Sequence, residues 1–297
     1  MRIVVSGASG LIGTSLVDDL RRDGHEVIRL VRREPTGPDQ LRWDPAAGRL
    51  DPAALSGADA IVHLSGAGVG DRRWTSRYKA TLIDSRVDST RTIATAAAQA
   101  EKPPKVLISA SGIDAYGDTG DREVREDEPF GTGFLADLCR VWEAATGPAE
   151  NAGIRVTHLR SGLVMGPSGG LMGRLKPLFK AGLGGRLGSG RQWWPWISLR
   201  DEVAAIRFLL TADAVAGPVN LVGPELVTNA EFTAEFARQV HRPALAPVPP
   251  FALRLALGDF ADNGILSSKR AVPGVLLDHG FEFTDATLAS ALRYSLS

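Results

Sequence analysis

A glycine-rich turn follows the first apolar run of the chain. It reads Gly7-Ala8-Ser9-Gly10-Leu11-Ile12-Gly13, and it stands between the β-branched residues 3–5 and an amphipathic stretch at residues 11–22. The first glycine permits a tight turn, the second lets the backbone approach a pyrophosphate, and the third lets a helix pack closely on a strand. The free N–H groups at the start of that helix favour phosphate. The spacing therefore predicts a dinucleotide site at Gly7, Ser9, Gly10, Leu11, Ile12 and Gly13, with a turn that binds no ligand as the alternative.

The second apolar run, residues 26–31, ends in two arginines. Val31, Arg32 and Arg33 stand where a dinucleotide-binding fold contacts the adenosine ribose, and Glu34 follows one or two positions too late for that contact. An NAD site normally carries an acid for the ribose 2′-hydroxyl, whereas an arginine can hold the 2′-phosphate of NADP. We therefore expect NADP(H) as the cofactor. A solvated, charged strand end is the alternative.

Short apolar runs alternate with segments of helical period through the first two-thirds of the chain. This alternation predicts βαβ crossovers and hence an α/β fold with a Rossmann-type, doubly wound parallel sheet. The expected strands are residues 3–5, 26–31, 60–64, 106–109, 156–160 and 217–222, and the expected helices between them include 11–22, 85–100 and 201–210.

The pattern changes after residue 165, where glycines become frequent. We expect a nucleotide-binding core over residues 1–165 that is re-entered at about residues 198–222. Residues 166–197 and 223–297 are expected to form a smaller C-terminal α/β substrate lobe. Its predicted helices cover residues 171–179, 229–240 with Asn229 as N-cap, 251–258, and a stretch from residue 273 onward.

Charge and cysteine content limit the classes of partner. The chain has 34 basic and 34 acidic residues, so no global positive field exists to hold nucleic acid or a membrane surface. The single cysteine, Cys139, excludes an internal disulfide, and the five scattered histidines form no metal-ligand motif. Apolar runs are too short to span a membrane, and no signal peptide is expected because Met1 leads directly into a strand. We expect a cytoplasmic protein with a small-molecule substrate and no metal; the oligomeric state is left open.

Further motifs run along almost the whole chain. With them the chain resembles the extended short-chain dehydrogenase/reductase superfamily of the nucleotide-sugar epimerase and dehydratase type. Within that superfamily it is most similar to the atypical subfamily of NAD-dependent epimerase/dehydratase-like "epimerase family proteins", which has its own C-terminal domain. The motifs are residues 109–118, Arg73-Trp74, Ser85-Arg86, residues 133–136 with Trp142-Glu143, residues 160–164, the glycines at 182–190, Pro195-Trp196-Ile197 and residues 228–232.

The resemblance implies a sheet of about seven strands that binds NADP(H), with the C-terminal lobe closing over the nicotinamide. It also implies further cofactor contacts. Those that follow the fourth strand fall on Leu64, Ser65 and Gly66, one on the next helix falls on Arg86, and a backbone contact after the sixth strand falls on Val164.

The tyrosine and lysine that serve oxidoreductases of this superfamily as acid/base pair are absent. Four residues after Tyr78 and Tyr116 stand Leu82 and Gly120, so the chain contains no Tyr-x-x-x-Lys. If Glu143 aligns with the acid that usually follows the lysine, Leu135 and Cys139 occupy the two positions. Ser111 remains to hydrogen-bond a substrate oxygen, and Tyr116 is the nearest candidate acid. A structural role for Tyr116 and an apolar role for Cys139 are the alternatives.

Three functions fit these residues. The first is an NADP(H)-binding oxidoreductase in which hydride passes between the nicotinamide and a carbonyl or alcohol held near Ser111. The second is a sugar-nucleotide epimerase or dehydratase, which needs an acid/base group that the missing pair does not supply. The third is a non-catalytic, NADPH-binding regulatory protein that presents a cofactor-dependent surface to a protein partner.

Overall fold

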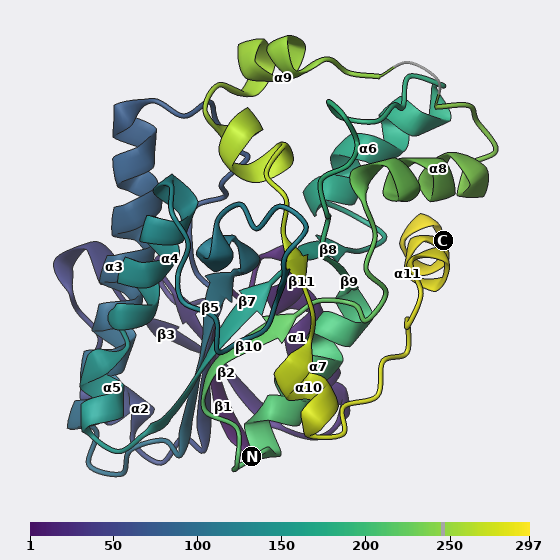
Figure 1. Cartoon of the computed structure of the whole chain (residues 1–297). Coiled ribbons are helices and arrows are strands. Elements are labelled where there is room, and N and C mark those ends of the chain that lie inside the picture. The colour runs from purple at the N-terminus through teal and green to yellow at the C-terminus, as the bar shows by residue number, and fades with distance from the viewer. Residues whose placement is uncertain (245–246) are drawn as a thin grey trace.

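A seven-stranded parallel sheet forms the centre of the molecule (Figure 1). The structure is a computed structural model that describes residues 1–244 and 247–297. Every neighbouring pair of strands in this sheet is parallel, so the expected doubly wound sheet is confirmed. Across the sheet the strands are β10 (Gly217–Leu221), β7 (Arg155–Ser161), β5 (Val106–Gly112), β4 (Ala60–His63), β1 (Arg2–Ser6), β2 (Glu26–Val31) and β3 (Gln40–Arg42).

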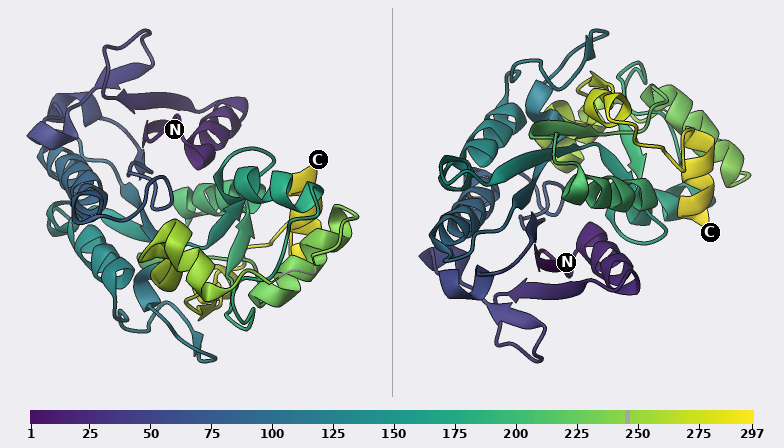
Figure 2. Two further views of the ribbon diagram at one scale, coloured as in Figure 1. Left: turned by 90° about the horizontal axis from the view of Figure 1, so that it is seen from above. Right: turned by 90° about the horizontal axis from the view of Figure 1, so that it is seen from below.

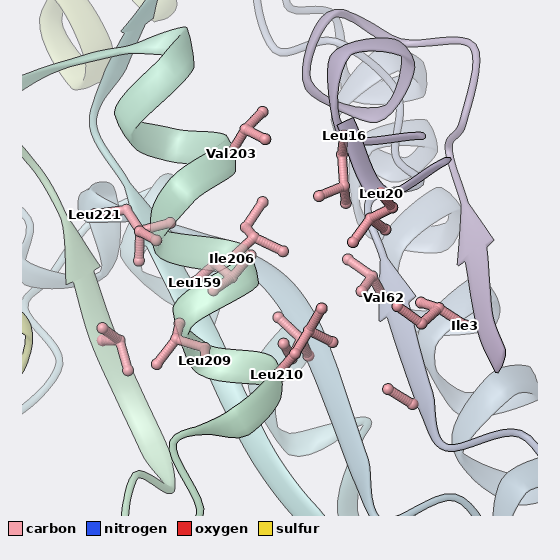
Figure 3. Packing of buried hydrophobic residues seen from close by; sticks show 14 of the residues in the cluster. Ile3, Leu16, Leu20, Val62, Leu159, Val203, Ile206, Leu209, Leu210 and Leu221 are labelled. Carbon is pink, nitrogen blue, oxygen red and sulfur yellow. The ribbon is translucent and has the colours of Figure 1, made fainter. Parts of the chain in front are cut away.

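One face of the sheet is covered by α1 (Leu11–Arg22) and α7 (Leu199–Thr211), which pack side by side. Figure 3 shows their aliphatic side chains meeting those of the strands. Leu16 and Leu20 of α1 and Ile206 and Leu209 of α7 are all fully buried there. This aliphatic face follows directly from the alternation of side chains along β1 and β4.

The opposite face is covered by α3 (Ser76–Gln99) and α4 (Phe134–Ala144), with the short helices α2 (Pro52–Leu55) and α5 (Gly147–Asn151) beside α3. Helix α3 begins nine residues earlier than expected. The Thr75 hydroxyl accepts a hydrogen bond from the Tyr78 N–H and caps the helix, so the polar residues before Ser85 are helical too.

A two-stranded parallel ribbon lies outside the central sheet and pairs β8 (Leu163–Met165) with β9 (Trp196–Ser198). Trp194 and Trp196 are buried in one cluster with Phe232 and Phe236. Figure 2 shows the purple N-terminal elements on one side of the molecule and the green and yellow late elements on the other. The helices of this part are α6 (Gly170–Lys180), α8 (Asn229–Gln239), α9 (Pro250–Leu257), α10 (Gly274–Asp278) and α11 (Leu288–Leu296).

The expected N-cap of α8 was wrong by one residue. Thr228, not Asn229, caps the helix: its hydroxyl accepts from the Glu231 N–H while the Glu231 carboxylate accepts from the Thr228 N–H. The Asn229 side chain accepts from the Leu187 N–H instead.

A second two-residue ribbon connects the end of the chain to the core. Strand β11 (Arg270–Ala271) pairs in parallel with β6 (Glu123–Val124). Ser268, just before β11, donates its hydroxyl proton to the Gly120 carbonyl, and its own carbonyl accepts from the Thr119 N–H. The segment that precedes β11 is thereby held against the loop that follows β5.

Candidate functional site

The glycine turn lies at the C-terminal edge of the sheet and is packed too tightly for side chains. Gly7 has φ of 68°, and a Cβ there would lie 2.6 Å from the carbonyl atoms of Leu64. A Cβ on Gly13 would lie 2.2 Å from the Gly7 oxygen. Helix α1 then starts at Leu11 with no side chain capping it, and Ser9 and Gly10 are exposed. The turn thus presents free backbone N–H groups at an open helix start, which is the arrangement that holds a phosphate.

The end of β2 presents exposed arginines. Arg32 and Arg33 both lie on the surface, and Arg33 donates to the Glu34 carbonyl and the Thr36 hydroxyl. The Glu34 carboxylate is ion-paired with Arg42 of β3. The carboxylate of the acid that follows the arginines is therefore already paired with an arginine of the neighbouring strand.

Arg86 on α3 lies beside the residues that follow β4. Its guanidinium stacks 4.7 Å from the centre of the Trp142 ring, and one N–H donates to the Leu82 carbonyl at 3.1 Å. Its Nε lies 3.6 Å from the point that a Cβ on Gly66 would occupy; it is buried and has no hydrogen-bond partner among the described residues. Burial lowers the pKa of Arg86 from its usual value. Buried donors normally have a hydrogen-bond partner, so an acceptor atom of a ligand could satisfy this Nε–H group.

Val164 of β8 reaches the same edge from the other side. The half-buried side chains of Val164, Leu11 and Ile12 pack against one aliphatic cluster. Gly170 at the start of α6 would bring a Cβ within 3.1 Å of Leu11. The structure thus gathers the predicted cofactor residues at one edge, although their role in binding stays a prediction.

Ser111, at the end of β5, belongs to a buried ionic network. Its hydroxyl donates to the Glu143 carboxylate at 2.6 Å. Arg160 of β7 makes a two-point ion pair with the same carboxylate at 2.9 and 3.0 Å. The hydroxyl is thus oriented with its oxygen free to accept a further hydrogen bond.

Tyr116 lies in the short helix η2 (Ile113–Tyr116) and is 3% exposed. Its hydroxyl donates to Asn220 of β10 at 2.7 Å, and the Arg160 guanidinium lies 4.9 Å from its ring centre. Burial raises the pKa of Tyr116 to about 12. This geometry favours the structural interpretation of Tyr116, and its catalytic role stays a prediction.

The two positions expected to lack the acid/base pair are both buried on α4. Leu135 and Cys139 are 4% and 3% exposed, one helical turn apart. The Cys139 thiol donates to the Gly112 carbonyl at 3.6 Å, and burial raises its pKa to about 12. Cys139 therefore stays a protonated thiol near neutral pH.

A second ion pair lies beside Cys139, and the sequence did not indicate it. The Lys269 ammonium, just before β11, is 2.9 Å from Asp114 Oδ1 in η2. Asp114 lies within the motif of residues 109–118, two residues before Tyr116, and no local pattern in the sequence marks Lys269 as its partner. Within the described residues, no group of three or more His, Cys, Asp or Glu side chains is placed to hold a metal ion.

The two core histidines are each hydrogen-bonded to a hydroxyl group. His63 of β4 is hydrogen-bonded to Ser6 at 2.6 Å and Thr90 at 3.0 Å, and burial lowers its pKa to about 3. His158 of β7 is hydrogen-bonded to Thr146 at 3.0 Å, and burial lowers its pKa as well. In the described chain, no helix combines the length and apolar character that crossing a bilayer requires.

Known proteins resemble this chain over its full length. The sequence profile described as the NAD dependent epimerase/dehydratase family matches residues 3–223, and a domain of unknown function (DUF1731) matches residues 248–294. An epimerase family protein of Mycobacterium bovis is 47% identical over 293 residues, which cover 99% of this chain and 97% of that protein. The human epimerase family protein SDR39U1 is 35% identical over 297 residues, which cover 99% of each chain.

Solved structures agree with these matches. The crystal structure of human SDR39U1 (isoform 2) with NADPH has a TM-score of 0.92 at 33% identity, and the match covers 100% of this chain and 99% of that one. MoeE5 in complex with UDP-glucuronic acid and NAD shares the fold, with a TM-score of 0.78 at 23% identity. The resemblance predicted from the motifs is confirmed: the chain belongs to the NAD dependent epimerase/dehydratase family, as one of its epimerase family proteins.

Proposed function

We propose that this protein is an NADP(H)-binding oxidoreductase of the atypical short-chain dehydrogenase type that acts on a small carbonyl or alcohol substrate. The glycine turn carries the proposal, because Gly7 and Gly13 have no room for side chains and α1 starts uncapped. The NADPH named for the human SDR39U1 structure supports the choice of cofactor. A cytoplasmic setting is proposed on the single cysteine.

The residues at this edge fit a dinucleotide on independent grounds. In the proposal, the N–H groups of the turn and of the start of α1 hold the pyrophosphate. Exposed Arg32 and Arg33 hold the 2′-phosphate, and the unsatisfied Nε of Arg86 donates to the cofactor beyond Gly66. When bound, the cofactor supplies or takes up the hydride. The substrate side is covered by the proposed C-terminal lobe, residues 166–197 and 223–297.

Ser111 is proposed to orient the substrate. Because its proton is already donated to Glu143, its oxygen is an acceptor in this arrangement. That suits the hydroxyl of an alcohol substrate, which donates one hydrogen bond. The Arg160 ion pair fixes the Glu143 carboxylate and so keeps the Ser111 hydroxyl in one orientation.

Calorimetric titration with NADPH and with NADH tests the cofactor proposal. We expect NADPH to bind at least tenfold more tightly, which corresponds to about 1.4 kcal/mol. The variant Arg32→Ala/Arg33→Ala should lose this preference while its affinity for NADH is unchanged. Arg22→Ala, which removes an exposed arginine from the far end of α1, is the matched control and should keep the preference. Absence of binding by either nucleotide would refute the proposal.

A non-catalytic NADPH-binding regulator is the second candidate, and the buried Leu135 and Cys139 at the positions of the missing pair favour it. Ser111→Ala separates the two candidates. Loss of turnover with unchanged NADPH binding supports the oxidoreductase. A partner protein that binds only in the presence of NADPH, together with no turnover by the unmodified chain, supports the regulator.

A further inference from the structure

We propose that Lys269 and Asp114 replace the missing tyrosine and lysine: the Lys269 ammonium is the proton donor to the substrate oxygen, and Asp114 positions and reprotonates it. Lys269 is thus a catalytic residue and Asp114 a positioning residue. This inference rests on the oxidoreductase function proposed above, and it names the acid/base group that this function needs.

Lys269 differs from the other lysines of the chain in its burial. Its side chain is 4% exposed, whereas the remaining five lysines are half-buried or exposed. An ammonium removed from water needs partners, and Lys269 has two: Asp114 Oδ1 at 2.9 Å and the Asn263 carbonyl at 3.4 Å. An ammonium carries three N–H donors, so one remains for a further acceptor.

The ion pair lies where the superfamily pair is missing. Asp114 Oδ2 and the Cys139 thiol lie 3.9 Å and 3.6 Å from the single point that a Cβ on Gly112 would occupy. Cys139 stands at the expected lysine position on α4, so the Asp114 carboxylate and that position border the same glycine. Ser111, which is proposed to orient the substrate, directly precedes this glycine, whose carbonyl accepts from the Cys139 thiol.

The other titratable groups around Asp114 are less suited to proton transfer. Arg86 of α3 interacts electrostatically with Asp114, and a guanidinium does not give up its proton in proteins. The thiol of Cys139 and the phenol of Tyr116 have pKa values raised to about 12 by burial. Glu143 is held by Arg160 and Ser111. Of these groups, Lys269 is therefore the one that is best suited to donate a proton to a substrate at this edge.

Proton and electron movements balance in the proposed step. The substrate carbonyl carbon accepts a hydride, NADPH is oxidised to NADP⁺, and the C=O double bond becomes a C–O single bond. The carbonyl oxygen takes a proton from Lys269, which becomes a neutral amine. Water then returns a proton to Lys269 by way of Asp114, whose side chain is 27% exposed. Alcohol oxidation follows the same path in reverse.

The test measures NADPH oxidation by the full chain with a fixed panel of carbonyl probes, namely 9,10-phenanthrenequinone, benzaldehyde and butanal. Lys269→Met should lower kcat about 100-fold to 10,000-fold, the usual effect of removing a general acid. Its affinity for NADPH, measured by calorimetry, should stay within threefold. The solvent deuterium isotope effect on kcat should also change in the variant, because the proton no longer comes from Lys269.

Two further variants separate proton transfer from a structural role. Asp114→Asn/Lys269→Met has no carboxylate left without its cation, so it should regain the stability lost in Lys269→Met without regaining turnover. Lys79→Met breaks a different ion pair, to Asp259, that joins the same C-terminal segment to α3, and it should retain turnover. In Lys269→Ala, added methylamine should restore turnover in proportion to its protonated fraction.

The outcomes distinguish this inference from the proposed function. If wild type binds NADPH but reduces none of the probes, the oxidoreductase proposal fails, and the inference fails with it. If wild type turns over and Lys269→Met or the double variant does so within threefold of wild type, only the inference is overturned. Loss of turnover with the cofactor affinity intact and rescue by methylamine supports it.

Discussion

The two faces of the central sheet differ in chemistry near the C-terminal ends of the strands. Under α1 and α7 the face is aliphatic, as Figure 3 shows for Leu16, Leu20 and Ile206. Under α3 and α4, near the C-terminal ends of the strands, the other face carries a buried polar layer. Its members are His63, Thr90, Ser111, Glu143, Thr146, His158 and Arg160, and each is hydrogen-bonded to another side chain.

This difference determines which face tolerates amino-acid substitution. Burial of aliphatic surface is non-directional, so the α1–α7 face depends on volume and packing. In the polar layer each group depends on specific hydrogen-bond partners in fixed orientations, because a buried polar group without a partner is strongly disfavoured. The polar layer ends at Ser111, so the face that is more sensitive to substitution is also the one that reaches the candidate site.

The largest effect is expected from Arg160→Met in the polar layer. The substitution leaves the Glu143 carboxylate buried without its cation, and it should lower the free energy of unfolding by about 3–5 kcal/mol. Urea unfolding measures the loss. The double variant Glu143→Gln/Arg160→Met should recover more than half of it; a loss below about 1 kcal/mol in the single variant would show that this layer is not held by the ion pair.

A somewhat smaller effect is expected on the aliphatic face. Leu209→Ala removes a fully buried side chain of α7 and should lower the free energy of unfolding by about 3 kcal/mol, from lost burial and the cavity left behind. Leu209→Met, which conserves volume, should lower it by less than about 1.5 kcal/mol. If both variants lost the same amount in urea unfolding, packing would not be the controlling property of this face.

Glu202 of α7 is a fully buried acid beside the aliphatic face and provides a third test. Burial raises its pKa to about 8, while Ser161 donates a hydrogen bond to it at 2.7 Å. Between about pH 4.5 and 8 the folded chain keeps this proton and the unfolded chain releases it, so stability falls as pH rises. Glu202→Gln should therefore be more stable than wild type at pH 6 by about 2 kcal/mol and equal to it near pH 4.5. Thermal unfolding at both values checks this.

His63 in the polar layer should respond to pH in the opposite direction. Its pKa of about 3 lies below the value of the unfolded chain, 6.5, so between these values only the unfolded state binds the proton. Stability is complete above pH 6.5 and falls by about 1.4 kcal/mol per pH unit below it. In His63→Gln this part of the slope between pH 6.5 and 4.5 should be missing. An unchanged slope would contradict the assignment of His63 as a neutral core residue.

The sequence predicted the backbone near the glycine turn very well. The bounds of α1 and β2 are those expected, because glycine spacing, helical period and β-branched runs are local signals. Cap residues decided the errors, since the Thr75 hydroxyl extends α3 and Thr228 rather than Asn229 starts α8. For α8 the choice lies between two adjacent polar side chains, whereas α3 begins nine residues before its expected start.

The candidate site was predicted only in part, for the same physical reason. The turn, the arginines after β2 and Ser111 stand in local motifs. The environments of Tyr116 and Cys139 depend on Asn220 and on the burial of α4, which no local pattern encodes. The contact between Lys269 and Asp114 joins residues more than half the chain apart, so only the folded structure reveals it.

The pairing of β11 with β6 has a consequence for biosynthesis. As the chain leaves the ribosome, the strands and the turn at Gly7 are synthesised long before the segment that carries Lys269. Domains form from the N-terminal side during synthesis, so a nascent chain can assemble the nucleotide-binding edge while Asp114 still lacks its cation. The segment that carries Lys269 thus completes the charge balance at the end of β5 only after the nucleotide-binding edge has been synthesised.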